Sequence, residues 1–304
     1  MNLDEFSRTR QRPLSLPALA ADKELAHDIQ GRLAALGVLD PYVDGKFGPV
    51  STWALGAFAE RVKINFRFEL SPELAMVLLR ADAQATFPLL PGDGLAARVV
   101  GALQRRGYWI ARGPGAANIV YIEGLDLDGS ANENAPNVFN DLRMIIKVAP
   151  NGAPNIEGMW EATTEPGRFY TQHPLDRGGA ARIAFGQHKA WSVGFHRNDH
   201  EALVQTDDLA FYRDLNKDYQ RKGDRLFTSM IGLNQHWGYD LPRGDIGHSS
   251  AGCLVGRTPQ GHREFMKIIK ADPRYEVSRG YKFMSTVISA SALTETNFDP
   301  TSQH

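Results

Sequence analysis

The chain has 304 residues, which as a soft prior is about two domains of ordinary size. Its 34 lysines and arginines against 35 aspartates and glutamates give a net charge of −1, so the broad positive field that holds nucleic acid or an anionic bilayer is not expected. The longest uninterrupted apolar run has six residues, Leu74 to Leu79, whereas a membrane span needs about 20, and the single cysteine, Cys253, excludes an intramolecular disulfide and any multi-cysteine metal site.

Residues 1–21 carry charges, serines and prolines without an apolar period, and they are expected to form a flexible leader. They lack the apolar centre of roughly 7–15 residues that a secretory signal needs, which predicts synthesis in the cytoplasm without a signal peptide. Residues 22–84 show helical spacing, as in Leu25, Ile29 and Leu33, which recur at steps of four on one face. The patterns predict three short helices in a small bundle, at 22–36, at 49–62 and from Pro72 onward.

Residues 85–97 contain two prolines and two glycines and are expected to be a linker between two domains. After it, residues 98–304 consist mainly of short β-type runs broken by Gly, Pro, Asn and Asp. One late helix interrupts them, with Thr258 as its N-cap and Pro259 in its first turn, and His262 on this helix is expected to be exposed. The predicted fold class is therefore α+β: a small three-helix bundle, then a β-rich, mostly antiparallel domain with a few helices.

The predicted bundle carries a set of motif residues around its first loop, namely Ile29-Gln30-Gly31-Arg32-Leu33, Val43-Asp44-Gly45-Lys46-Phe47-Gly48-Pro49, Ser51, Ala54 and Phe58. Asp44 and Gly45 are turn residues, and the tight loop that they form aims Phe47 into the bundle. In these positions residues 22–84 resemble the peptidoglycan-binding domain of type 1, whose pattern is L-Q-x-x-L, V-D-G-x-F-G and A-x-x-x-F. The resemblance implies binding to bacterial peptidoglycan, with Asp44 on the loop rim either as a turn former or as a ligand contact.

The single cysteine ends a run of small residues, Gly247-His248-Ser249-Ser250-Ala251-Gly252-Cys253. His236 stands 17 residues earlier (253 − 236), which is enough chain for a strand, a crossing loop and a return onto a neighbouring strand. A thiol needs a base to react near neutral pH, and a histidine beside it supplies one. The small residues leave room for a substrate carbonyl, and backbone N–H groups there can hold an oxyanion. Cys253 and His236 are therefore the predicted nucleophile and base.

This constellation resembles the catalytic domain of the L,D-transpeptidases, the YkuD-like family. His236 matches the family's histidine, and Ser250, Gly252 and Cys253 match its second block, which Leu254 continues with an apolar residue. The sequence departs from the pattern at two positions. Ala251 replaces the motif's histidine, and Val255 stands where Arg or Asn is expected, with His248 and Arg257 near enough along the chain to substitute.

The resemblance implies cleavage of peptidoglycan stem peptides after the L-centre of the diamino acid at position three, without a cofactor. Cys253 would attack the carbonyl, His236 would move the proton, and the amides of Gly252 and Cys253 would hold the oxyanion. Water as acceptor makes the enzyme a hydrolase, whereas an amine makes it a transpeptidase that forms cross-links. The missing signal favours a lysin-like hydrolase that acts on the wall after release or delivery, and a monomer is expected. The expected substrate contacts are Trp237, Gly238, Tyr239, His248, Arg257 and Asp44.

Three other interpretations stay open from the residues alone. His236, His248 and Cys253 are a possible ligand set for zinc in an N-acetylmuramoyl-L-alanine amidase. Glu161 and Glu165 offer two carboxylates beside an aromatic residue, as a muramidase needs. A wall-binding protein without activity would need only the first domain. The remaining polar and aromatic residues near the predicted hairpin are given structural or surface roles, or no role at all: Arg182, Gln187, His188, Trp191, His196 and His200.

Overall fold

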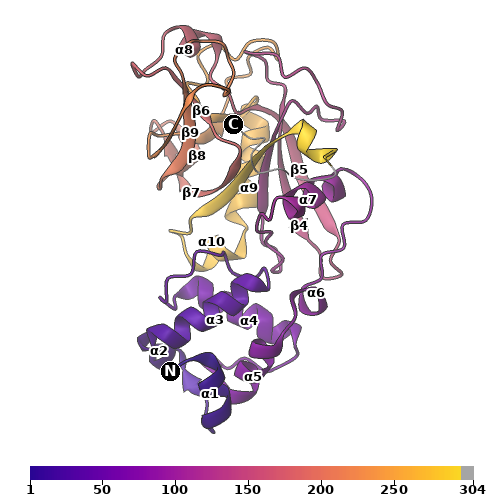
Figure 1. Ribbon diagram of the computed structural model, residues 1–304, viewed down its shortest axis with the longest axis vertical. Coiled ribbons are helices and arrows are strands. Elements are labelled where there is room, and N and C mark those ends of the chain that lie inside the picture. Colours follow the sequence, from indigo (N-terminus) through magenta and orange to yellow (C-terminus); the bar gives the residue numbers. More distant parts are fainter. Residues whose placement is uncertain (296–304) are drawn as a thin grey trace.

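The computed structural model describes residues 1–295 and consists of a helical part and a β-rich part (Figure 1). The two parts lie at opposite ends of the long axis, with α10 (Pro273–Val277) at the junction. Helices occur together with mostly antiparallel sheets, which confirms the predicted α+β class. None of the helices within residues 1–295 combines the length and the apolar character that a membrane crossing requires.

The helical part is built from short helices whose ends are set by local sequence. The expected helices correspond to α3, α4 and α5. Asp22 accepts a hydrogen bond from Leu25 N at 3.1 Å, and Ser71 accepts one from Leu74 N at 3.0 Å, so both act as N-caps. Apolar side chains of α1 to α5 form one common core. The elements are α1 (Leu3–Thr9), β1 (Leu14–Ser15), α2 (Leu16–Ala21), α3 (Lys23–Ala35), α4 (Pro49–Arg61), β2 (Glu69–Leu70), α5 (Pro72–Arg80) and α6 (Ala83–Thr86).

The expectation of a flexible leader is wrong, because residues 1–21 belong to this core. Leu3 and Phe6 stand one turn apart on α1 and are 2% and 0% exposed, and Leu19 of α2 is also buried. Asn2 caps α1 by accepting from Glu5 N at 2.8 Å. Since α1 contains only two apolar residues, it is too short to show a helical period in the sequence.

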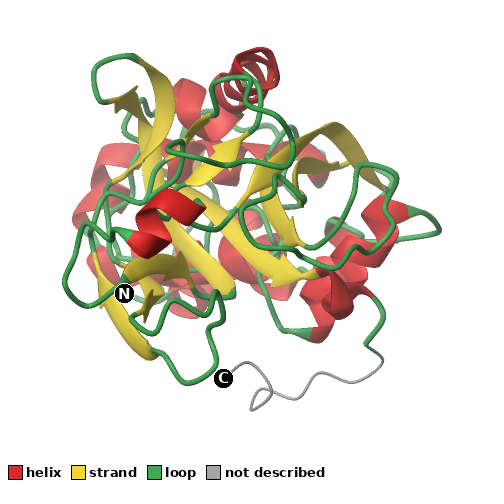
Figure 2. Cartoon of the chain, turned by 90° about the horizontal axis from the view of Figure 1, so that it is seen from above, coloured by secondary structure: helices red, strands yellow, loops and turns green. Residues whose placement is uncertain are grey.

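The β-rich part is a closed barrel with the strand order β11-β12-β5-β4-β3-β13-β7-β8. Two neighbouring pairs are parallel, β11 with β12 and β13 with β3, and the other pairs are antiparallel. Viewed from above, the strands gather in the middle and loops run around them (Figure 2). The barrel strands are β3 (Asn118–Glu123), β4 (Asp141–Val148), β5 (Pro154–Thr163), β7 (Gly186–His196), β8 (His200–Gln205), β11 (Gln235–Trp237), β12 (Leu254–Gly256) and β13 (Phe283–Ser289).

A smaller antiparallel sheet and several helices complete this part. The sheet has the order β10-β9-β6. The helix α7 begins inside the expected linker 85–97, in which Phe87 and Leu89 are buried, so this segment packs against the protein. The additional elements are α7 (Leu95–Arg105), α8 (Arg168–Gln172), β6 (Ala180–Ile183), β9 (Leu209–Asp214), β10 (Arg225–Ser229), α9 (Pro259–Lys270) and a 3-10 helix (Ala290–Leu293).

A buried arginine fills the space between the barrel and α9. The guanidinium of Arg143 on β4 lies 4.2 Å from the ring centroid of Phe265 and 5.2 Å from that of Trp160. Its Nη1 lies 3.1 Å from His262 Nδ1, and His262 Nε2 lies 2.9 Å from Glu201 O. The expectation that His262 is exposed is therefore wrong: the residue is 1% exposed, because it faces this arginine rather than solvent.

The helical and β-rich parts meet at a buried carboxylate, Asp40. It accepts hydrogen bonds from Tyr281 Oη and Lys189 Nζ, each at 2.7 Å, and from Arg274 Nη1 at 3.2 Å. Burial by itself raises the pKa of Asp40, but the charges of Arg274 and Lys189 outweigh it and hold the pKa below its ordinary value. A backbone bond from Arg112 N to Gly37 O, 2.7 Å long, also joins the two parts.

The substitution Asp40→Asn is expected to destabilise the folded protein, because it removes the charge that faces Lys189 and Arg274 in a buried site. Breaking such a pair from one side costs about 3 kcal/mol or more. Since the folded pKa of Asp40 is lowered, its contribution is present at neutral pH and is lost as the pH falls through that pKa. Urea denaturation at pH 7 and pH 3 measures both effects. The exposed control Asp93→Asn should change little, and equal stability of the two variants would contradict the role of Asp40.

Candidate active site

His236 lies on β11, and Cys253 directly precedes the neighbouring strand β12. In the parallel pairing of β11 and β12, His236 lies opposite Val255, and Leu254 N donates to Asn234 O at 2.9 Å. Paired residues of neighbouring strands point to one face of a sheet, and so do residues two apart along a strand. Cys253 stands two residues before Val255 and packs in one cluster with it, so it lies on the side of the sheet to which His236 points.

The ring of His236 is held in one tautomer. Its Nδ1 lies 2.7 Å from the backbone oxygen of Trp237, and since a carbonyl only accepts, Nδ1 carries the proton. The other nitrogen, Nε2, is left as an acceptor. Burial, with the nearby ring of His196 as the next cause, lowers the pKa of His236 to about 3. His236 is therefore a neutral base at physiological pH.

The thiol of Cys253 is 8% exposed and lies against Gly232 O, with an Sγ to oxygen distance of 3.6 Å. Burial raises its pKa above the ordinary value, although the backbone N–H of Asn234 and the charge of Arg197 act in the opposite direction. Among the described residues, no hydrogen bond joins Sγ to the His236 ring. The resting pair is thus a protonated thiol on the same face as a neutral imidazole.

The loop before the thiol is held by Ser250 and needs glycine at position 252. Ser250 Oγ donates to Cys253 O at 2.8 Å and accepts from Gly252 N at 3.1 Å. Gly252 has φ = 126°, and a Cβ there would collide with Ala181 O. The amide of Gly252, expected to hold an oxyanion, is therefore already used within the loop. Ser250 and Gly252 shape the loop around Cys253.

Several residues at this site were not predicted from the sequence. The ring of His196, at the end of β7, stacks on that of His236 with a centroid distance of 3.9 Å and an angle of 16°. Asn234 Nδ2 lies 2.9 Å from His196 Nδ1, and burial lowers the pKa of His196 to about 4. Arg197 and Asn198 follow with φ of 51° and 56°, which forms the tight turn between β7 and β8.

His200, the first residue of β8, extends this cluster toward α9. Its Nδ1 lies 2.9 Å from Asp199 Oδ2, and its ring stacks on Trp237 at a centroid distance of 3.9 Å. The signal that could have indicated this arrangement is the polar segment Arg197-Asn198-Asp199 with a histidine on each side, since a short hairpin loop places its flanking residues opposite each other. His196 and His200 are indeed paired across the turn.

Three of the expected substrate contacts lie at the end of β11. Trp237 lines a cavity beside His200. Gly238 N donates a hydrogen bond to Gly256 O. A Cβ at position 238 would lie 2.6 Å from Arg257 O, so glycine is needed here because the two backbone segments lie so close together. Tyr239 is 50% exposed. Trp237 and Tyr239 therefore stay available to a ligand, whereas the glycine at position 238 is explained by the packing of the backbone.

The other three expected contacts are placed differently. Arg257 is held by Glu161, with an Nε to Oε2 distance of 2.6 Å, so its charge is already paired. His248 is exposed and packs on Phe169 at a centroid distance of 3.9 Å, rather than joining His196 and His236. Asp44 lies in the helical part and accepts from Lys46 N at 2.9 Å. It acts there as a turn former with an exposed side chain.

The ligand sets of two alternative interpretations are not assembled in the structure. Within residues 1–295, no three His, Cys, Asp or Glu side chains are grouped so that they could hold a metal ion, so His236, His248 and Cys253 do not form a zinc site. The two acids considered for a muramidase are both paired: Glu161 with Arg257, and Glu165, which is 3% exposed, with Arg182.

Glu165 belongs to a buried group of acids and arginines behind the loop of Cys253. Burial raises the pKa of Glu165 to about 8, against the charge of Arg182, and raises the pKa of Asp141 to about 7. Gly167 N donates to Ser250 O at 2.9 Å, which links this group to the loop that carries the thiol. The proton content of the group therefore changes near neutral pH.

The substitution Glu165→Gln is expected to flatten the pH dependence of stability. A carboxyl whose folded pKa is raised stabilises the protein below its unfolded pKa, near 4.5, and this contribution is lost as the pH rises toward 8. The unfolding free energy of the wild type should thus fall between pH 5 and pH 8.5 more steeply than that of the variant. Denaturant titrations at the two pH values, with exposed Glu133→Gln as control, measure this. Parallel curves for wild type and Glu165→Gln would contradict it.

The charge of Arg197 is expected to promote ionisation of the thiol. Arg197→Gln should raise the pKa of Cys253 and slow its alkylation by iodoacetamide about two- to threefold at pH 8, a modest effect because the arginine is exposed. The single cysteine makes the rate readable by intact-mass spectrometry. Lys222→Gln removes an exposed charge elsewhere and serves as control. Equal rates for the two variants at every pH would contradict an action of Arg197 on the thiol.

No protein-family model matches the sequence, and no curated protein sequence matches it. Among solved structures, the chain is similar to a protein described as a fused Zn-dependent amidase/peptidase/peptidoglycan-binding domain-containing protein from Clostridium acetobutylicum. The identity is 13% and the TM-score 0.28, over 91% of this chain and 100% of the other. A likeness of this size carries no information about activity. The resemblances to the two wall-related families therefore rest on the quoted motif residues.

Proposed function

We propose that the protein is a peptidoglycan hydrolase that cleaves stem peptides, with Cys253 as nucleophile and His236 as base. The proposal is supported by the position of Cys253 directly before β12, on the side of the sheet to which His236 of β11 points, and by the tautomer of His236, whose Nε2 is an acceptor. Stacking on His196 restricts the orientation of the ring. The motif residues of the helical part, which resemble a peptidoglycan-binding domain, supply the choice of substrate.

The chemistry follows from the two neutral groups. The sulfur of Cys253 attacks the peptide carbonyl carbon while its proton passes to His236 Nε2, so the imidazole becomes positive only during the reaction. The C–N bond then breaks, and the departing amine takes that proton, which leaves a thioester on Cys253. Water attacks the thioester as His236 accepts a proton from it, and the same proton returns to the sulfur as the new acid leaves. With an amine in place of water, these steps would form a cross-link.

The low pKa of His236 gives the proposal a recognisable pH behaviour. A base is active only when it is unprotonated, and burial keeps the pKa of His236 at about 3. The imidazole is thus ready to accept a proton throughout the range from pH 5 to 7. A thiolate–imidazolium pair, by contrast, would lose activity as acid protonates the thiolate.

Cys253→Ala and His236→Ala are each expected to lower the release of muropeptides from purified sacculi by about 10³-fold or more, since nucleophile and base act as a unit. Mass spectrometry of the soluble products measures the activity and identifies the bond that is cut. Sedimentation with sacculi should remain unchanged, because wall binding is assigned to the helical part. Glu133→Gln, an exposed change outside the site, is the matched control.

Three results would overturn this proposal. Full activity of Cys253→Ala would remove the thiol from the mechanism. Loss of wild-type activity in a chelator, with recovery on adding zinc, would favour an amidase instead. Binding to sacculi without any change in the muropeptides would indicate a wall-binding protein without this activity.

A further inference from the structure

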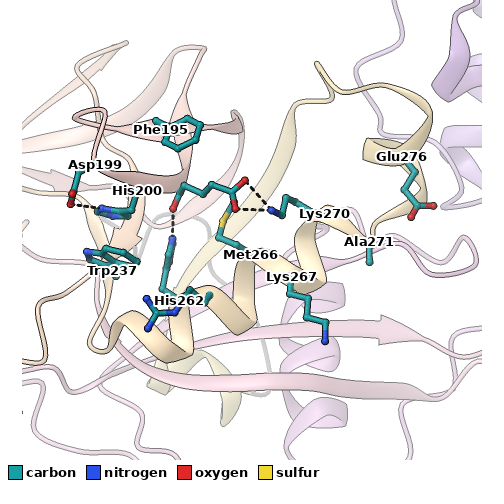
Figure 3. A pocket seen from close by; sticks show the side chains of 12 residues that line it. Phe195, Asp199, His200, Trp237, His262, Met266, Lys267, Lys270, Ala271 and Glu276 are labelled. Atoms are coloured by element: carbon teal, nitrogen blue, oxygen red, sulfur yellow. Dashed lines mark hydrogen bonds and ion pairs between the residues drawn. The ribbon is translucent and has the colours of Figure 1, made fainter.

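The strand β8 begins at His200 and ends at Gln205. His200 lies beside Trp237 in the wall of a cavity of about 720 Å³, which Cys253 does not line (Figure 3). The groups that face the sulfur belong to the segment 231–234, which directly precedes β11. This segment is bound to the other end of β8, at Gln205.

The buried side chain of Gln205 is the acceptor for three successive backbone amides. Its Oε1 lies 3.2, 2.8 and 2.8 Å from the backbone nitrogens of Ile231, Gly232 and Leu233. These three N–H groups have no other acceptor within the described part of the chain. Buried amides need such a partner, so the position of the segment depends on this one oxygen.

The orientation of the Gln205 amide is fixed by further hydrogen bonds. Its Nε2 donates to Asp207 O at 2.9 Å and to Ser229 O at 3.1 Å, and since carbonyls only accept, Oε1 must face the segment. The backbone N of Gln205 donates to Asn234 Oδ1 at 2.9 Å. Four successive residues, 231–234, are therefore bonded to Gln205.

The segment held in this way supplies the surroundings of the thiol. Gly232 O lies 3.6 Å from Cys253 Sγ, and the backbone N–H of Asn234 favours the ionised sulfur. A Cβ at Gly252 would lie 3.1 Å from Leu233 Cδ2, so Leu233 packs against the loop that carries the thiol. The segment therefore both covers the sulfur and contacts it with polar backbone atoms.

We propose that Gln205 is a positioning residue for the nucleophile, because its side chain holds the segment 231–234 against the sulfur of Cys253. No hydrogen bond between described residues joins Gln205 to Cys253, so Gln205 acts through Gly232 O and the Asn234 amide. Without Oε1, three N–H groups would turn toward water and the sulfur would lose its cover. The importance of this effect for catalysis rests on the proposed function, whereas the effect on the thiol does not.

The test compares two substitutions of Gln205 of similar size. Gln205→Met offers only a weak acceptor to the segment. Since burial is the largest cause of the raised pKa of Cys253, exposing the sulfur should lower this pKa and speed alkylation by iodoacetamide about threefold or more at pH 8. Gln205→Glu keeps an oxygen for the three amides and adds a negative charge that disfavours the thiolate, so its alkylation should be no faster than that of the wild type. Intact-mass spectrometry over a pH series measures the rates.

A variant that only weakens the fold serves as the control. Asp40→Asn, which is expected to destabilise the junction of the two parts, should keep the wild-type pH profile of alkylation under conditions in which it is folded. Hydrogen exchange of the peptide 229–234 should increase in Gln205→Met more than in Asp40→Asn. If Gln205→Met does not fold, Gln205→Asn gives the same comparison, because its shorter side chain withdraws the oxygen from the segment. A folded variant of either kind with wild-type alkylation and exchange would overturn the inference.

Turnover of a soluble stem peptide separates the inference from the proposed function. Gln205→Met is expected to lower kcat about tenfold or more with little change in KM, since it displaces the nucleophile without touching substrate. Gln205→Glu should restore part of that loss. Faster alkylation with unchanged kcat would refute the positioning role, whereas a wild-type protein that does not cleave stem peptides would refute only the hydrolase.

Discussion

The structure of the candidate site depends on the parallel pairing of two three-residue strands, β11 and β12. This pairing closes the barrel and places His236 opposite Val255, which packs against Cys253. The packing around these two strands leaves no room for a side chain at two glycines. A Cβ at Gly256 would collide with the guanidinium of Arg143, and one at Gly238 would meet the backbone of Arg257. Arg143 therefore constrains the strand that directly follows Cys253.

The histidines of the site are positioned by hydrogen bonds and by ring stacking. The carbonyl of Trp237 orients His236, Asn234 contacts His196, and Asp199 sets the tautomer of His200. Burial and the proximity of neighbouring rings lower the pKa of His196 and of His236, so these two imidazoles remain neutral near pH 7. Such a pair of rings can accept protons without first repelling a cationic ligand, and the charge of Arg197 at its border also disfavours their protonation.

Much of the fold could be predicted because its signals are local. The caps Asp22, Ser71 and Thr258 begin helices where the sequence indicates, and the alternating runs form strands. The spacing also led us to expect His236 and Cys253 near two neighbouring strands, whereas their catalytic roles stay a prediction. Contacts between distant segments could not be predicted. Arg143 contacts His262 in the core, and the turn at Arg197 brings His196 onto the ring of His236. Neither contact produces a periodic pattern in the sequence. For the same reason the burial of Leu3 and Phe6 could not be predicted, because their short helix is stabilised by its contacts with the helical bundle.

The burial of Cys253 has a consequence for its chemical lifetime. Oxidation by peroxide proceeds through the thiolate and needs access to the sulfur, so a thiol that is 8% exposed and has a raised pKa is oxidised slowly. The protein has no second cysteine that could capture a sulfenic acid as an internal disulfide. Protection of the sulfur must therefore come from the fold itself, and the loop of Ser250 and Gly252 shields the thiol against oxidants while it also restricts access for substrate.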